Sequence, residues 1–104
     1  MKYYDLKTDF GRYKVRIEKE TYEYSGGLAI ALITDEDELF AVMTVNLGGY
    51  CLDDNEAFVD TNNCYWAERF IKDNNLGKKT EFTGHSGYCE YPLYEFDLSK
   101  IIGE

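Results

Sequence analysis

Residues Arg12–Glu20 alternate between apolar and charged side chains more regularly than any other part of the chain. The odd positions from 13 to 17 are apolar: Tyr13, Val15 and Ile17. The even positions are charged: Arg12, Lys14, Arg16 and Glu18. Because successive side chains of a strand point to opposite faces, this period of two predicts a β-strand with one dry and one solvated face. Residues 3–8 should form the neighbouring strand of an antiparallel hairpin, with Gly11 free to adopt a positive φ at the connection.

The rest of the chain carries further strand patterns. Residues 28–33 are continuously apolar, which predicts a central strand covered on both faces. Residues 39–47 alternate and predict the next strand, residues 57–59 a short extended piece, and residues 88–96 the last strand. Because Pro92 cannot donate a ladder hydrogen bond, we expect the last strand to lie at an edge or to bulge there.

One helix is expected over about residues 64–74. Trp66 and Phe70 lie four positions apart and supply its apolar stripe. If Asn75 takes the left-handed conformation, Leu76 falls where a Schellman cap places a hydrophobic side chain against the end of the helix. The sequence therefore marks the end of this helix clearly.

The length of 104 residues indicates a single domain, residues 1–104, with one hydrophobic core. Residues 76–82 are expected to lead away from the helix, and residues 84–87 to form a turn. The fold class that follows is α+β. We expect a curved antiparallel sheet of five or six strands, with the helix at about 64–74 packed on one face.

The charges are distributed unevenly along the chain. It has 20 acidic and 11 basic residues and a net charge of −9, and residues 20–68 contain no lysine or arginine. A negative surface argues against nucleic acid as a direct ligand and against anionic membranes. It suits a basic protein surface, a divalent cation, or solubility alone.

A set of exposed acids is the candidate partner-binding surface: Asp35, Glu36, Asp37, Glu38, Asp53, Asp54, Glu56 and Asp60. Three tyrosines are candidate aromatic anchors at its centre: Tyr22, Tyr24 and Tyr50. The N-terminal residues lack the basic and then apolar pattern of a signal peptide, and no apolar run approaches the length of a membrane span. We therefore expect a cytoplasmic protein with reduced thiols.

Catalytic and metal motifs are weak. His85, the single histidine, lies in Gly84-His85-Ser86-Gly87, and Tyr88 stands where the nucleophile elbow needs its last glycine. Cys64 near the start of the helix could be an activated thiol or a small apolar residue of the core. Zinc ligation by the cysteines and His85 lacks the usual short spacing, and no segment follows the calcium-loop pattern. We expect no catalytic residues, no metal and no cofactor.

Several short motifs resemble a family of small acidic proteins of unknown function. The matching segments are Thr8-Asp9-Phe10-Gly11, Thr44-Val45-Asn46-Leu47, Phe58-Val59-Asp60-Thr61-Asn62-Asn63-Cys64, Trp66-Ala67-Glu68, Thr83-Gly84, Ser86-Gly87-Tyr88 and Tyr91-Pro92-Leu93-Tyr94. Members often have arginine in place of His85 and proline in place of Gly48. The resemblance implies an accessory role on conjugative or phage-like elements of gut bacteria and no defined activity.

The sequence leaves two classes of function open. The first is a binding module that presents the acidic segments to a basic surface, with an antidefence inhibitor that imitates the charge of DNA as its sharpest form. The second is a small enzyme that uses Cys64 or His85. A domain whose acidic face serves solubility alone is the further alternative.

Overall fold

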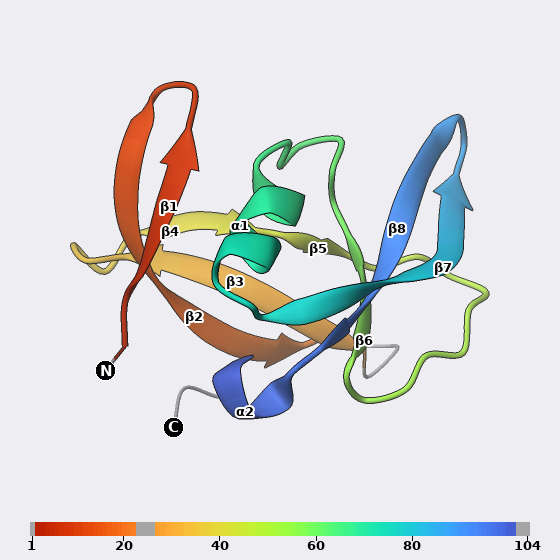
Figure 1. Cartoon of the computed structure of the whole chain (residues 1–104). Helices are drawn as coiled ribbons and strands as arrows, with labels where there is room; N and C mark the ends of the chain where they lie inside the picture. The colour runs from red at the N-terminus through yellow and green to blue at the C-terminus, as the bar shows by residue number, and fades with distance from the viewer. Residues whose placement is uncertain (1, 23–26, 102–104) are drawn as a thin grey trace.

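Two antiparallel sheets of four strands each make up the fold in the computed structural model, which describes residues 2–22 and 27–101 (Figure 1). The first sheet has the order β1-β2-β3-β4, built from Tyr4–Thr8, Gly11–Thr21, Leu28–Thr34 and Leu39–Val42. The second has the order β5-β6-β8-β7, and these strands are Thr44–Val45, Glu56–Val59, Cys89–Phe96 and Gly77–Ser86. Two short helices, α1 (Ala67–Asp73) and α2 (Leu98–Ile101), complete the described elements.

The prediction of one curved sheet of five or six strands with one helix is wrong. Residues 39–47, expected as one strand, are divided between the two sheets at Met43. The Met43 N–H donates to the carbonyl of Ile30 in the first sheet at 3.0 Å, and its carbonyl accepts the N–H of Asp60, just after β6, at 2.9 Å. Met43 and Thr44 are both buried, so the alternation of exposed and buried side chains breaks at this change of sheet, although the alternating pattern read from the sequence gave no sign of it.

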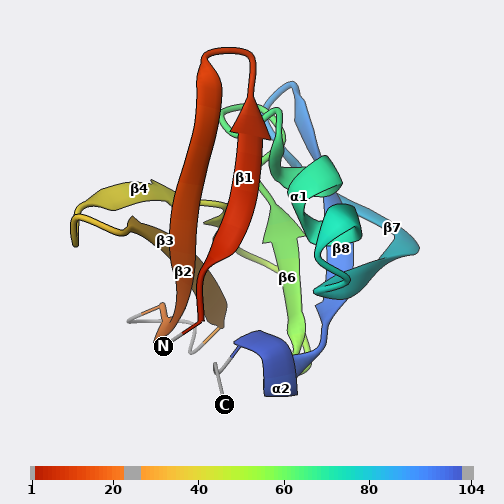
Figure 2. The same ribbon diagram turned by 60° about the vertical axis from the view of Figure 1, so that its left-hand side comes forward.

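The main core joins apolar residues of both sheets with α1. Its fully buried members include Leu6 and Leu32 from the first sheet, Val59 from the second, and Ile71 from α1. Each sheet can cover the apolar face of the other, and this is why the chain forms two layers instead of one broad sheet. Figure 2 shows α1 lying beside β1 on one side and β7 and β8 on the other.

A smaller apolar cluster covers the opposite face of the second sheet. Phe58, Tyr91 and Leu93 point outward from β6 and β8, and Leu47 and Leu52 from the β5–β6 loop pack on them. This cluster packs the long β5–β6 loop against the second sheet.

The helix and its end were predicted well. The helical residues are Ala67–Asp73, within the expected 64–74, and Trp66 and Phe70 are buried as expected. Asn75 has φ of 56°, and the N–H of Leu76 donates to the carbonyl of Ile71 at 2.9 Å, which completes the Schellman cap. The prediction missed α2, whose Ile101 is fully buried.

The region after the helix differs from the prediction. Residues 76–82 and 84–87 were expected to be a connection and a turn, but β7 runs from Gly77 to Ser86. Gly84 lies within this strand. The position needs a glycine because a Cβ there would be 2.6 Å from the ring of Phe58. Pro92 lies in β8, an interior strand and not an edge. The β7–β8 register shifts between Lys79 and Thr83, beside the Thr83–Pro92 pair, and the extra residues belong to β7 and not to the strand that contains Pro92.

Candidate functional site

The predicted contact acids fall into separate groups. Asp35–Glu38 form the turn between β3 and β4, whereas Asp53, Asp54 and Glu56 belong to the long β5–β6 loop and the start of β6. Figures 1 and 2 both place the β3–β4 turn and the base of β6 toward different ends of the molecule. The eight predicted acids therefore do not form one continuous face.

The β3–β4 turn lies beside cations of β2. The Arg16 guanidinium is 2.7 Å from Asp37 through Nη1 and 2.9 Å from Glu18 through Nη2. The hydrogen bond to Glu18, together with that to Asp37, raises the pKa of Arg16 further above its usual value. Arg12 and Lys14 line the same shallow hollow as the turn, which has a volume of about 540 Å³. Part of the negative charge of the turn is thus offset locally.

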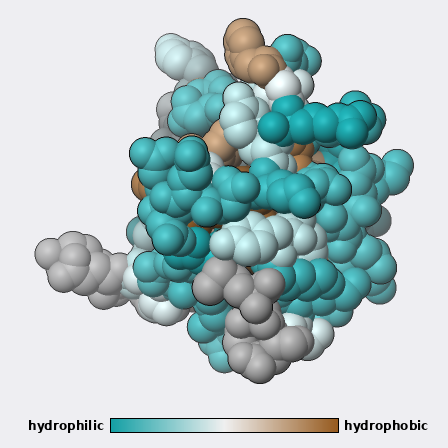
Figure 3. Space-filling view, turned by 90° about the vertical axis from the view of Figure 1, so that its left-hand side faces the viewer, coloured by the Kyte–Doolittle hydropathy of each residue, from teal (hydrophilic) through white to brown (hydrophobic). Residues whose placement is uncertain are grey.

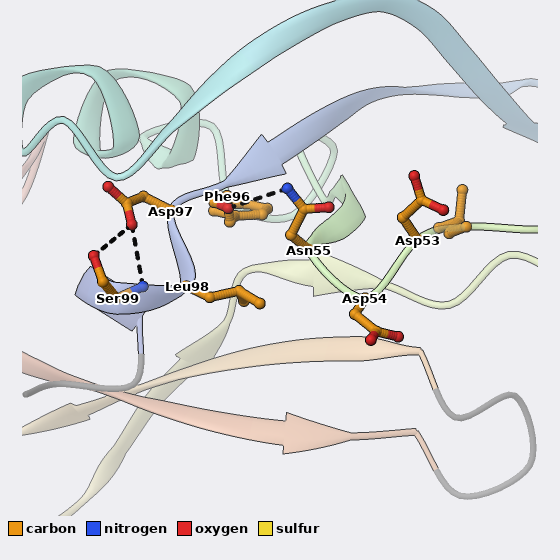
Figure 4. A pocket seen from close by; sticks show the side chains of 8 residues that line it. Asp53, Asp54, Asn55, Phe96, Asp97, Leu98 and Ser99 are labelled. Atoms are coloured by element: carbon orange, nitrogen blue, oxygen red, sulfur yellow. Dashed lines mark hydrogen bonds between the residues drawn. The ribbon is translucent and has the colours of Figure 1, made fainter.

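The β5–β6 loop borders a hollow whose lining, among the described residues, includes three acids, Asp53, Asp54 and Asp97, and no lysine or arginine. This hollow measures about 720 Å³, and Figure 4 shows its lining from two segments, Asp53–Asn55 and Phe96–Ser99. The Asp53 N–H donates to Glu56 Oε1 at 2.8 Å, which gives Glu56 a role in holding the loop. The N–H of Phe96 donates to the Asn55 carbonyl at 2.8 Å and fixes the two segments together.

The second segment adds acids that sequence reasoning did not select. Glu95 is the direct partner of Glu56 in the β6–β8 register, and Asp97 follows the end of β8. Asp97 Oδ1 accepts the hydroxyl of Ser99 at 2.6 Å and its N–H at 3.1 Å, and the hydroxyl contact lowers the pKa of Asp97. The Asp97-Leu98-Ser99 motif before a short helix was the available sequence signal for this cap.

We call the resulting group of five carboxylates the acidic end: Asp53, Asp54, Glu56, Glu95 and Asp97. Two lysines lie near it. Lys78 is the register partner of Glu95, and Lys100 Nζ donates to the carbonyl of Asn75 at 2.9 Å. The acidic end therefore keeps an excess of negative charge on a surface that solvent reaches.

Asp60 and the candidate tyrosines are less available than expected. The Asp60 carboxylate accepts the N–H of Asn63 at 3.2 Å and its side-chain amide at 3.0 Å, so Asp60 stabilises its own turn. Tyr22 is half-buried and its hydroxyl shares a hydrogen bond with Thr44. Tyr50 is 41 % exposed, and its hydroxyl accepts the N–H of His85 at 3.1 Å. Tyr24 lies outside the described residues.

Cys64 and His85 have different surroundings. Cys64 is 5 % exposed, and its thiol donates to the carbonyl of Val42 at 3.7 Å. Burial, and secondarily the charge of Asp60, raise the pKa of Cys64 to about 11, so the thiol stays protonated at neutral pH. His85 is exposed, with Nδ1 4.0 Å from Glu90. No hydrogen bond or ion pair in the described part of the chain joins these two residues.

Metal ligands do not gather anywhere in residues 2–22 and 27–101. Within those ranges, no group of three or more His, Cys, Asp or Glu side chains is arranged to hold a metal ion. The described helices are also too short to span a bilayer. The acidic end presents negative charge on a loop that hydrogen bonds hold in place.

A family model described as a domain of unknown function, DUF4313, matches residues 16–102. Neither a curated protein nor a solved structure matches the chain.

Proposed function

The chain belongs to the DUF4313 family, a domain of unknown function, and we propose that it is a non-enzymatic protein that binds a basic protein surface through its acidic end. One observation carries the proposal. The Asn55–Phe96 hydrogen bond brings Asp53 and Asp54 to the same hollow as Asp97, and the β6–β8 pairing sets Glu56 opposite Glu95 in the adjoining strands. The number of these carboxylates exceeds that of the nearby lysines.

The physical basis of the proposal is electrostatic complementarity. Like charges held close together raise the energy of the free protein, and a partner rich in lysine and arginine relieves that repulsion. At physiological salt such attraction extends over roughly 8 Å, so salt weakens association between exposed charges. Tyr50, from the same β5–β6 loop, is the candidate aromatic contact, since the residue is 41 % exposed and its ring packs on Phe58 at 5.0 Å between centroids.

The finer form of the proposal is an antidefence inhibitor. Such a protein, carried on a mobile element of gut bacteria, would occupy a nucleic-acid-binding protein of the host by imitating the charge of DNA. The net charge of −9 supports this form, because a DNA-binding surface is rich in lysine and arginine. A DNA duplex should then compete with the protein for the captured partner.

The alternative functions differ in measurable ways. An enzyme based on Cys64 would need a reactive thiolate, and the raised pKa of this buried thiol opposes one. An acidic surface that serves solubility alone would give no salt-sensitive complex.

A pull-down from the lysate of a gut bacterium, at about 50 mM and about 500 mM salt, tests the proposal. We expect a basic protein at low salt that is lost at high salt. Replacement of Asp53 and Asp54 by lysine should abolish capture. Glu81→Lys with Glu90→Lys is the matched control, because it makes the same change in charge on the exposed β7–β8 hairpin.

Two results would contradict the assignment. Recovery of no basic protein at low salt would remove the proposed function. Loss of capture with Glu36→Lys and Glu38→Lys, but retention with Asp53→Lys and Asp54→Lys, would move the contact from the acidic end to the β3–β4 turn.

A further inference from the structure

The N-terminal part of strand β2 extends past the end of its neighbour β3. The β1–β2 ladder covers Gly11–Val15, whereas the β2–β3 ladder begins at the Val15–Thr34 pair and runs to Thr21. Residues 11–14 therefore have a strand neighbour on the β1 side only. Figure 2 shows the β1–β2 hairpin extending well beyond the turn that joins β3 and β4.

The backbone direction along β2 determines which residues face the open side. The Tyr22 N–H donates to the Gly27 carbonyl at 2.9 Å, at the entry to β3. Because backbone groups of a strand alternate between its two neighbours, the other even-numbered residues of β2 also direct their N–H and C=O toward the β3 side. Arg12 and Lys14 are therefore the residues that face the space beyond the end of β3. In the described turns and loops no backbone group supplies a partner for either.

An aromatic floor lies next to this open edge. The rings of Tyr13 and Phe40 have centroids 4.8 Å apart, and Phe40 in turn lies 5.6 Å from Trp66. Phe40 is the extra residue of a bulge, because Leu32 pairs with Ala41 while Ile33 pairs with Leu39. Bulges re-aim side chains in this way. Figure 3 views this side of the molecule and shows hydrophobic surface in recesses between hydrophilic residues.

Three carboxylates border the same hollow: Asp35, Glu36 and Glu38. All three are exposed. Among the acids of this turn, the described residues show an ion pair for Asp37 alone, with Arg16. Arg12 and Lys14 line the same hollow, so its three carboxylates exceed its two bases by one negative charge. A lysine or arginine side chain of an approaching ligand would meet this excess at the turn, where the three carboxylates lie. The hollow volume of about 540 Å³ leaves room for a few residues of extended chain.

We infer that this notch accepts an extended, basic peptide segment that adds a strand to β2. We define the notch as the backbone of Arg12–Lys14, the Tyr13–Phe40 floor and the three turn carboxylates. The segment's main chain hydrogen-bonds to Arg12 and Lys14, one apolar side chain rests on the floor, and a lysine or arginine faces the turn. The notch shares no residue with the acidic end, so the two sites are independent.

The test uses ¹⁵N-labelled protein and a capped pentapeptide, Lys-Val-Lys-Val-Lys, as the probe. We expect the amide signals of Arg12 and Lys14 to shift on titration and their hydrogen exchange to slow. The acidic peptide Glu-Val-Glu-Val-Glu should leave them unchanged, because the turn repels it. A version of the basic peptide methylated on its valine nitrogens should also fail, because it lacks main-chain donors.

Lys14→Pro is the decisive variant. The Lys14 N–H points away from β1, so proline removes a donor from the notch and leaves the hairpin ladder intact. Its matched control is Asp5→Pro, which lies opposite Lys14 in the register and loses a donor at the outer edge of β1. We expect Lys14→Pro to weaken peptide binding roughly tenfold and Asp5→Pro to leave it unchanged.

A second variant keeps the test decisive if Lys14→Pro does not fold. Glu36→Gln with Glu38→Gln retains the backbone and should weaken binding of the basic peptide several-fold. The inference is overturned if the basic peptide shifts no signal of the notch at millimolar concentration. Equal binding by Lys14→Pro and by the original protein would overturn it as well.

Discussion

Replacement of Tyr94 by phenylalanine should destabilise the domain by about 1.5 kcal/mol at neutral pH. The Tyr94 hydroxyl donates to Glu68 Oε2 at 2.6 Å, and Lys79 Nζ lies 3.0 Å from the same oxygen. This contact joins α1 to β8 and β7. A hydrogen bond to a charged group contributes roughly 1.5–3 kcal/mol, and we take the lower end because the Glu68 side chain is 37 % exposed.

The pH dependence of this penalty follows from Glu68. Burial alone would raise the pKa of Glu68, but the hydrogen bonds from Tyr94 and Lys79 outweigh it and lower the pKa below the ordinary value. A carboxyl group with a lowered folded pKa stabilises the protein above its unfolded pKa, and this stabilisation is lost as the pH falls through the folded pKa. The penalty of Tyr94→Phe should therefore shrink in acid.

Urea unfolding followed by the fluorescence of Trp66 measures this prediction. The free energy of unfolding is compared for the original protein, Tyr94→Phe, Glu68→Gln and the double variant, at about pH 7 and about pH 3. The double-mutant cycle should show coupling at neutral pH. Additive effects of the two substitutions, or an equal penalty for Tyr94→Phe at both pH values, would refute the reasoning.

Three further predictions concern the core, a strand and a thiol. Trp66→Ala should cost roughly 3–5 kcal/mol in a thermal or urea melt because the ring is 8 % exposed, and an unchanged melt would contradict its placement. Gly77→Ala should cost about 1–3 kcal/mol, since a Cβ there would lie 2.6 Å from a backbone oxygen of β8, whereas Gly48→Ala has no atom within 4 Å and should cost far less. Iodoacetamide should label exposed Cys51 in the native protein before buried Cys64, and rapid labelling of Cys64 at neutral pH would show that its thiol is activated.

The end of α1 shows how much local sequence can predict. Asn75 and Leu76 complete the cap within five residues of Ile71, so the interaction depends on neighbours along the chain. The first hairpin and the apolar strand at 28–34 were predicted for the same reason. The β7 strand was missed because Gly84 looked like a turn residue, whereas the close packing of Phe58 and Leu47 accounts for a glycine there.

The candidate site was predictable only in part. The sequence shows Asp53 and Asp54 as exposed acids, and they are exposed. It does not show that Glu95 and Asp97 join them, because that depends on strand pairing across about forty residues. Sequence reasoning also treated Asp37 as a contact residue, whereas Arg16 is 2.7 Å away and offsets its charge.

The sequence alone was enough to place the first hairpin, the apolar strand that follows it and the main helix with its end, and it fixes the net charge of −9. These properties arise from side-chain alternation, backbone preferences and composition, all of which act over a few neighbouring residues. Only the tertiary fold shows that Met43 divides a continuous pattern between two sheets, and that Asp35–Glu38 lie apart from Asp53, Asp54 and Glu56. Those outcomes depend on which apolar faces cover each other, a condition that the whole chain must satisfy at once.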